Sequence, residues 1–173
     1  EANVLKVRGD VKVREGDLGG AREDYAAALA IYRAIGDRLG EANVLKALGD
    51  VKVHEDDLGG AREDYAAALA IYRAIGSRLG EAHVLQARGD VKVREGDLRG
   101  AREDYAAALE ISCAIGDRLG EADVLKARGD VKVREGDLGG AGEDYAAALA
   151  IYRASGDRLG EANVLQALGD VKV

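Results

Sequence analysis

The sequence predicts an all-α fold in which antiparallel helix pairs stack into a solenoid, and three observations predict it. The five residues at positions 1–5 return almost unchanged every 40 residues, beginning at Glu41, Glu81, Glu121 and Glu161. Each 40-residue block holds two segments with the apolar period of a helix, and glycine-rich segments separate them. One helix pair cannot bury both of its apolar stripes, whereas stacked pairs can.

The repeats define the expected domain organisation. We expect a single repeat domain over 1–173, made of repeats 1–40, 41–80, 81–120 and 121–160 and a partial repeat 161–173. Repeats 1–40 and 41–80 are nearly identical. Because the chain begins without methionine and stops in mid-repeat, we expect it to be a fragment of a longer array.

The first helix of each pair, here called helix A, is expected at about 41–55 in the second repeat. Val44, Ala47 and Val51 have the spacing i, i+3, i+7, which is that of one helix face, and Leu45 and Leu48 lie beside them. Helix A therefore presents an apolar stripe along its length.

The second helix, here called helix B, is expected at about 60–75. Its apolar positions also follow a helical period, and the run of three alanines at 66–68 favours helix over strand. These positions are Ala61, Tyr65, Ala68, Leu69, Tyr72 and Ile75. In the first repeat, Asp17 is expected to cap the start of helix B and Gly36 to end it. The segments 16–20 and 36–40 are expected to be breaks between helices.

Composition excludes several classes of protein. Cys113 is the single cysteine, so a disulfide-stapled scaffold is excluded, and no apolar run is long enough to cross a membrane. A net charge of −7 opposes a broad nucleic-acid-binding surface. We therefore expect a protein that binds neither nucleic acid nor membrane. No signal peptide is present, so we expect it to be cytoplasmic.

The residues of each block resemble the tetratricopeptide repeat family. The family pattern is matched by Leu45-x-x-Leu48-Gly49, followed by Ala61-x-x-x-Tyr65 and Ala68. The block is longer than the 34-residue form and is similar to the 40-residue variant of kinesin light chains and of the sensor regions of bacterial signalling ATPases. The resemblance implies a right-handed α-α superhelical solenoid of nine helices. The extra residues are expected to lengthen helix B and its exit turn.

Two positions depart from the family pattern. Arg8, Arg88 and Arg128 replace the second leucine of the pattern. The aromatic residue expected near the end of helix A is a lysine in every repeat, namely Lys12, Lys52, Lys92, Lys132 and Lys172. We therefore expect looser packing near the ends of the A helices. The aliphatic stems of these lysines and arginines are expected to cover apolar surface while their charged groups reach water.

The resemblance implies a non-enzymatic scaffold that binds a peptide or helix of a partner protein in the concave groove lined by the A helices. The implied groove residues share one face of helix A in each repeat. They are Asn3, Lys6, Asp10, Val13 and Arg14; Asn43, Lys46, Asp50, Val53 and His54; His83, Gln86, Asp90, Val93 and Arg94; Asp123, Lys126, Asp130, Val133 and Arg134; and Asn163, Gln166, Asp170 and Val173.

No pattern predicts catalysis, a cofactor or a metal. The chain has no phosphate-binding glycine loop, and its histidines, His54 and His83, each occur in one repeat only. Arg-Gly-Asp occurs at 8–10, 88–90 and 128–130 and resembles the integrin-recognition tripeptide. Because it falls inside helix A, with its glycine at the packing position, we expect it to be structural.

An alternative interpretation is a structural array that self-associates through uncapped ends. The last helix repeats the interior pattern with Ala162, Val164, Leu165, Ala167, Leu168 and Val171, and the first helix presents Ala2, Val4, Leu5 and Val7. We expect Ala162, Leu165 and Leu168 to form a homodimer contact. A closed dimer is favoured over an open fibre, because the chain stops out of register for head-to-tail stacking.

Overall fold

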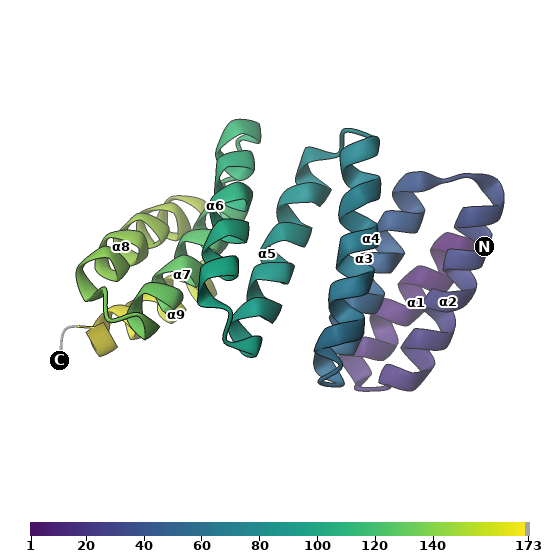
Figure 1. Cartoon of the computed structure of the whole chain (residues 1–173), viewed down its shortest axis with the longest axis horizontal. Coiled ribbons are helices and arrows are strands. Elements are labelled where there is room, and N and C mark those ends of the chain that lie inside the picture. Colours follow the sequence, from purple (N-terminus) through teal and green to yellow (C-terminus); the bar gives the residue numbers. More distant parts are fainter. Residues whose placement is uncertain (172–173) are drawn as a thin grey trace. The chain divides into compact units, whose positions relative to one another are not determined.

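The computed structural model describes residues 1–170 and the backbone of residue 171, so Lys172 and Val173 lie outside the described residues. Residues 1–171 form nine helices and no strand, as the sequence predicts (Figure 1). The helices are α1 (Ala2–Glu15), α2 (Leu18–Ile35), α3 (Arg38–His54), α4 (Leu58–Ala74), α5 (Arg78–Glu95), α6 (Leu98–Ile115), α7 (Arg118–Arg134), α8 (Leu138–Ser155) and α9 (Arg158–Val171). Odd-numbered helices are the A helices and even-numbered helices the B helices.

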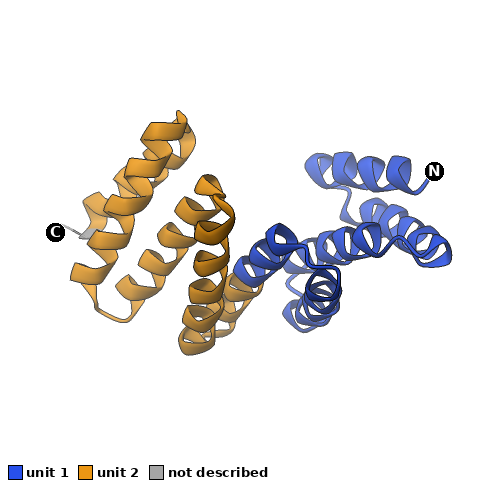
Figure 2. Cartoon of the chain, turned by 90° about the horizontal axis from the view of Figure 1, so that it is seen from above, with its two compact units in different colours: residues 1–87 blue, residues 88–173 orange. Residues whose placement is uncertain are grey.

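The chain divides into two compact units, residues 1–87 and 88–173, with the boundary inside α5 (Figure 2). In the first unit α1 packs on α2, α2 on α3, and α3 on α4. In the second unit α6 packs on α7, α7 on α8, and α8 on α9. Each unit is thus a series of helical hairpins, and the expectation of a single repeat domain stays a prediction.

The helices begin earlier than the glycine-rich segments suggested. The side chain of Asp37 accepts a hydrogen bond from the backbone N–H of Gly40 at 2.9 Å, so α3 starts at Arg38. An aspartate at this position caps the helix and overrides the weak helix propensity of the glycine in its first turn. The expected cap at Asp17 is confirmed by the same bond, to Gly20 at 2.9 Å.

The turn from helix B to the next helix A is short. Only Gly36 and Asp37 separate α2 from α3, and Gly36 has the left-handed φ of 72° expected of a residue that ends a helix. The expectation of a lengthened exit turn was therefore wrong. The extra residues of the 40-residue repeat lie in the helices, which are 17 or 18 residues long from α2 to α8.

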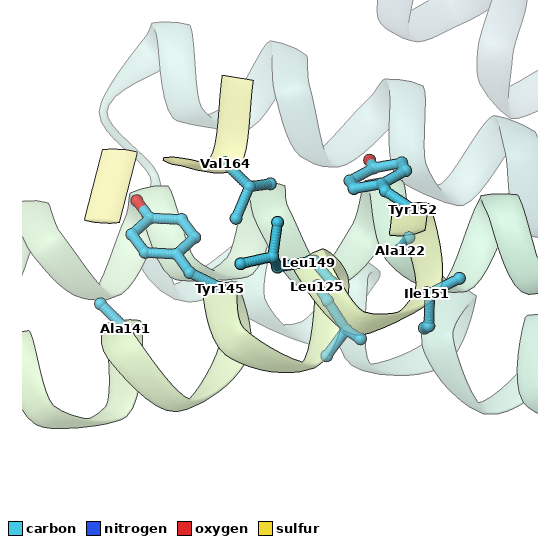
Figure 3. Close-up of a cluster of buried hydrophobic side chains, with 9 residues drawn as sticks. Ala122, Leu125, Ala141, Tyr145, Leu149, Ile151, Tyr152 and Val164 are labelled. Atoms are coloured by element: carbon cyan, nitrogen blue, oxygen red, sulfur yellow. The ribbon is translucent and has the colours of Figure 1, made fainter. Parts of the chain in front are cut away.

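Within the units, α2 and α8 are each buried between their own A helix and the next one. In the second unit, Tyr145, Leu149 and Tyr152 of α8 pack with residues of α7 and with Val164 of α9. Figure 3 shows Val164 over Leu149, between the two tyrosine rings. In the first unit, the buried side chains of α2 pack in the same way against Val44 and Val51 of α3. The core therefore depends on contacts between successive repeats.

The terminal A helices are exposed on one side only. In α1, Val4 and Val7 are exposed as expected. Ala2 is buried and Leu5 is half-buried against α2, so the expectation that these two residues are exposed was wrong. In α9, Ala162 and Leu165 are exposed as expected. Val164 is instead buried against α8, and Ala167 and Leu168 are half-buried beside the same cluster.

Candidate peptide-binding groove

The A helices of the first unit line a cleft of about 500 Å³. It brings together most of the groove residues expected on α1 and α3, with Tyr25 of α2 between them. Its lining residues are Lys6, Asp10, Val13, Arg14, Tyr25, Asn43, Lys46, Ala47, Asp50 and Val51. The alanine and the tyrosine were not predicted as groove residues, and Val51 takes part where Val53 was expected.

Similar clefts lie between successive A helices of the second unit. Each is lined by charged residues together with uncharged ones, small or aliphatic residues among them. The cleft from α5 to α7 is lined by Asp90, Val93, Tyr105, Ala127, Asp130, Val131 and Arg134. The clefts from α7 to α9 are lined by Asp130, Val133, Arg134, Tyr145, Ala167 and Asp170, and by Lys126, Asn163, Gln166, Ala167 and Asp170.

The groove aspartates are held by the fold. The hydroxyl of Tyr25 donates to Asp10 at 2.7 Å, and the Nζ of Lys6 donates to the other carboxylate oxygen at 2.7 Å. The same tyrosine bond recurs at Asp50, Asp90 and Asp130, with distances of 2.6–2.8 Å. Each of these carboxylates is therefore held in place by hydrogen bonds within its own unit.

Burial raises the pKa of several of these tyrosine hydroxyls, Tyr25 and Tyr72 among them. Burial, reinforced by the hydrogen bond to Asp10, raises the pKa of Tyr25 above its ordinary value. Burial and the charge of Asp50 raise the pKa of Tyr72 to about 12. The phenols thus remain hydrogen-bond donors at neutral pH.

A second tyrosine bond orients the first groove residue of the A helix. The hydroxyl of Tyr72 donates to Asn43 at 2.7 Å, and the pairs Tyr32–Asn3 and Tyr152–Asp123 repeat it. The third repeat has His83 and Ser112 at these two positions, so both members of the pair change together. That joint change is visible in the sequence and is the signal from which this unpredicted contact could have been found.

The remaining predicted groove residues occupy the same helices outside these clefts. Gln86 is half-buried and His83 exposed in α5. His54 and Arg94 are exposed in the last turns of α3 and α5.

The residues that depart from the family pattern form ion pairs with a buried aspartate of helix B. In the first repeat Arg8 donates to both oxygens of the buried Asp24, and the Nζ of Lys12 lies 2.9 Å from the same carboxylate. The same cluster recurs in the third repeat as Arg88, Asp104 and Lys92, and in the fourth as Arg128, Asp144 and Lys132. The sequence did not predict that the aspartate of helix B supplies a partner for these cations, and the looser packing there stays a prediction.

These clusters keep the buried carboxylate ionised. Burial opposes the charge of Asp104, but hydrogen bonds from Arg88 and Lys92 outweigh it and lower its pKa. Such a paired charge ties helix A to helix B, because removing the cations leaves the aspartate buried and unmatched.

The Arg-Gly-Asp segments lie inside the A helices, with the glycine at a packing position, as the sequence predicted. In residues 8–10 the arginine binds Asp24, and the aspartate accepts a bond from Tyr25. A Cβ atom on Gly9 would lie 2.6 Å from the Tyr25 ring. All three residues are therefore engaged inside α1.

Cys113 does not have the setting of a nucleophile. Burial and the neighbouring Glu121 raise the pKa of its thiol, which lowers the thiolate fraction. Among the described residues, no three His, Cys, Asp or Glu side chains gather as a metal site would require.

Residues 1–74 match the family model described as the tetratricopeptide repeat. Residues 81–154 repeat that segment at the same 40-residue period. The matched repeats are tetratricopeptide repeats. No protein of curated function matches this sequence. None of the described helices has the length and apolar content of a membrane span.

This chain is similar in fold to several solved structures of tetratricopeptide repeat proteins. The three described below share 17–19% sequence identity with it, so the likeness shows the fold alone. BtubC (BKLC) from P. vanneervenii matches with a TM-score of 0.74 at 19% identity, over 97% of this chain and 78% of that one. The apo form of RapI matches with a TM-score of 0.88 at 17% identity, over 99% of this chain and 62% of RapI.

A further match is a signal-transduction ATPase with numerous domains from Pyrococcus horikoshii, which has a tetratricopeptide repeat sensor. Its TM-score is 0.79 at 18% identity, over 98% of this chain and 25% of the ATPase. The chain thus spans less than two thirds of RapI and a quarter of the ATPase.

Proposed function

We propose that this protein is a non-enzymatic interaction scaffold whose A-helix groove binds a peptide or helix of a partner protein. Tetratricopeptide repeats typically mediate protein–protein interaction. The observation that carries the proposal is the recurrence of clefts between successive A helices within both units. Linings that combine aliphatic and small residues with charged residues suit a partner with both apolar and charged side chains.

The chemistry of the first cleft narrows the expected ligand. Ala47 and Val13 are half-buried and offer apolar contact. Two ion pairs line the same cleft, Lys6–Asp10 and Lys46–Asp50, each with 2.7 Å between the lysine Nζ and a carboxylate oxygen. Because both lysines are already paired, a ligand gains from shape and apolar contact more than from binding a lysine. A mixed, amphipathic peptide fits this surface best.

Peptides selected from a random display library on the immobilised chain test the proposal. Ala47→Arg places a long charged side chain in the cleft and is expected to weaken the selected peptides at least about tenfold, because it blocks a buried contact. The matched control is Ala66→Arg, on the exposed side of α4. If the two variants bind the peptides equally well, the groove is not the binding surface.

A second candidate is self-association through the terminal helices, and one contrast favours it. Leu165 in α9 is 44% exposed, whereas its counterparts Leu45, Leu85 and Leu125 are 2–7% exposed. In each of those repeats the following B helix is present. We propose that in the 173-residue chain a second copy covers Ala162 and Leu165 and forms a closed dimer.

Sedimentation velocity over a range up to hundreds of micromolar tests the dimer. Leu165→Glu is expected to give a monomer at all concentrations, because it puts a charge into the apolar contact. Leu159→Glu is the control, since this residue of α9 is exposed and so are its counterparts Leu39, Leu79 and Leu119. A wild-type chain that stays monomeric throughout would contradict the second candidate.

A further inference from the structure

One repeat lacks the arginine that the others use to bind their buried aspartate. The third and fourth repeats show the full arrangement. The Nε and Nη2 of Arg88 donate to the two oxygens of Asp104, and Arg128 does the same to Asp144. The second repeat has Leu48 at this position.

The aspartate of the second repeat is therefore only partly satisfied. The Nζ of Lys52 lies 2.7 Å from one oxygen of Asp64, but no arginine among the described residues pairs with this carboxylate. Its side chain is 16% exposed, against 4–6% for the aspartates that have an arginine. A carboxylate can accept two parallel bonds from a guanidinium, and here that capacity is unused.

A cleft of about 520 Å³ opens at this place in the first unit. It is lined by Gly19, Arg22, Glu23, Ala26, Leu48, Lys52 and Asp64, and it shares no lining residue with the peptide groove. Its cations already have partners, because Arg22 pairs with Glu55 at 3.2 Å and Lys52 pairs with Asp64. Glu23 adds an exposed negative charge, so the cleft favours a cation.

We propose that this cleft is a binding site for an arginine side chain of a partner protein, whose guanidinium takes the place beside Asp64 that arginines of the chain itself take in the other repeats. Leu48 offers the apolar surface on which the flat, weakly hydrated guanidinium rests. A lysine fits less well, because its ammonium group cannot make the two parallel bonds.

Nuclear magnetic resonance titration at low salt tests the site. The probes are three capped tripeptides, Gly-Arg-Gly, Gly-Lys-Gly and Gly-citrulline-Gly. The arginine peptide is expected to shift the backbone amide signals of Leu48, Lys52 and Asp64 in a saturable way. The lysine peptide is expected to bind several-fold more weakly, and the neutral citrulline peptide is expected to cause no saturable shift, since it lacks the charge.

The decisive variant is Leu48→Arg, which gives the second repeat the residue that the first, third and fourth repeats already have. It is expected to fold, to pair with Asp64 and to weaken the arginine peptide at least about tenfold, because its own guanidinium fills the site. Leu48→Met keeps the site open and is expected to bind like the wild type.

Two results would overturn the proposal. One is the absence of saturable shifts at these three residues with the arginine peptide. The other is equal binding by the wild type and Leu48→Arg, which would place the interaction at other acidic groups of the surface. Asp64→Asn provides a further check, since it removes the charge and is expected to abolish binding. If the A-helix groove is found not to bind peptides, the test of the arginine site still stands, because the two clefts share no lining residue.

Discussion

Replacing Gly49 by leucine is expected to destabilise the first unit strongly, although leucine is the better helix former. A Cβ atom at this position would lie 2.5 Å from the Cε1 atom of Tyr65, far inside van der Waals contact. The ring cannot easily move away, because it is buried and its hydroxyl is bonded to Asp50. Overpacking of this kind costs about 1–3 kcal/mol or more, which exceeds the gain of about 1 kcal/mol in helix propensity.

Chemical denaturation followed by circular dichroism measures this loss. Gly49→Ala is expected to destabilise as well, since the first added carbon already makes the clash. The matched control is Gly142→Ala in α8, where a Cβ would meet nothing within 4 Å and three other repeats have arginine. That variant is expected to stabilise by roughly 0.5–1 kcal/mol. A stable Gly49→Leu variant would refute the close-packing role of this glycine.

An excised single hairpin is expected to be largely unfolded. The segment 37–76 keeps the N-cap of α3 and the glycine that follows α4, so the loss of helix caps cannot explain its behaviour. It loses α2, against which Val44 and Val51 are completely buried in the chain. It also loses Gly80, on which the ring of Tyr72 packs. Short helices without such packing are marginal in water.

Far-ultraviolet circular dichroism checks this expectation. The segment 1–76, which adds the preceding hairpin, is the comparison and is expected to show more helix per residue, because it restores the contact between α2 and α3. A single hairpin with the full helical signal and a cooperative thermal transition would contradict the dependence of each repeat on its neighbours.

The sequence by itself determined the helices and the repeat. Spacing along one chain is a local property, so the apolar period and the alanine run sufficed to predict α3 and α4 to within a few residues. The cap at Asp17 and the end at Gly36 were predictable for the same reason, since both act within one turn of helix. The starts of the A helices were missed because a capping aspartate outweighs the glycine that follows it.

Part of the groove was also predictable. Lys6, Asp10 and Arg14 lie one turn apart on one helix face, and the structure lines one cleft with them. Tyr25 was missed, because it comes from helix B and reaches this cleft only after the two helices have packed.

The tertiary structure alone decided which charges are paired and which faces are covered. Arg8 and Asp24 are 16 residues apart, and nothing local to either residue shows that the carboxylate will be buried against the guanidinium. The partly satisfied Asp64 became visible only by comparison with its paired counterparts in space. The physical reason is that burial depends on the neighbouring helix, whereas helix formation and capping depend on the residues within a turn or two.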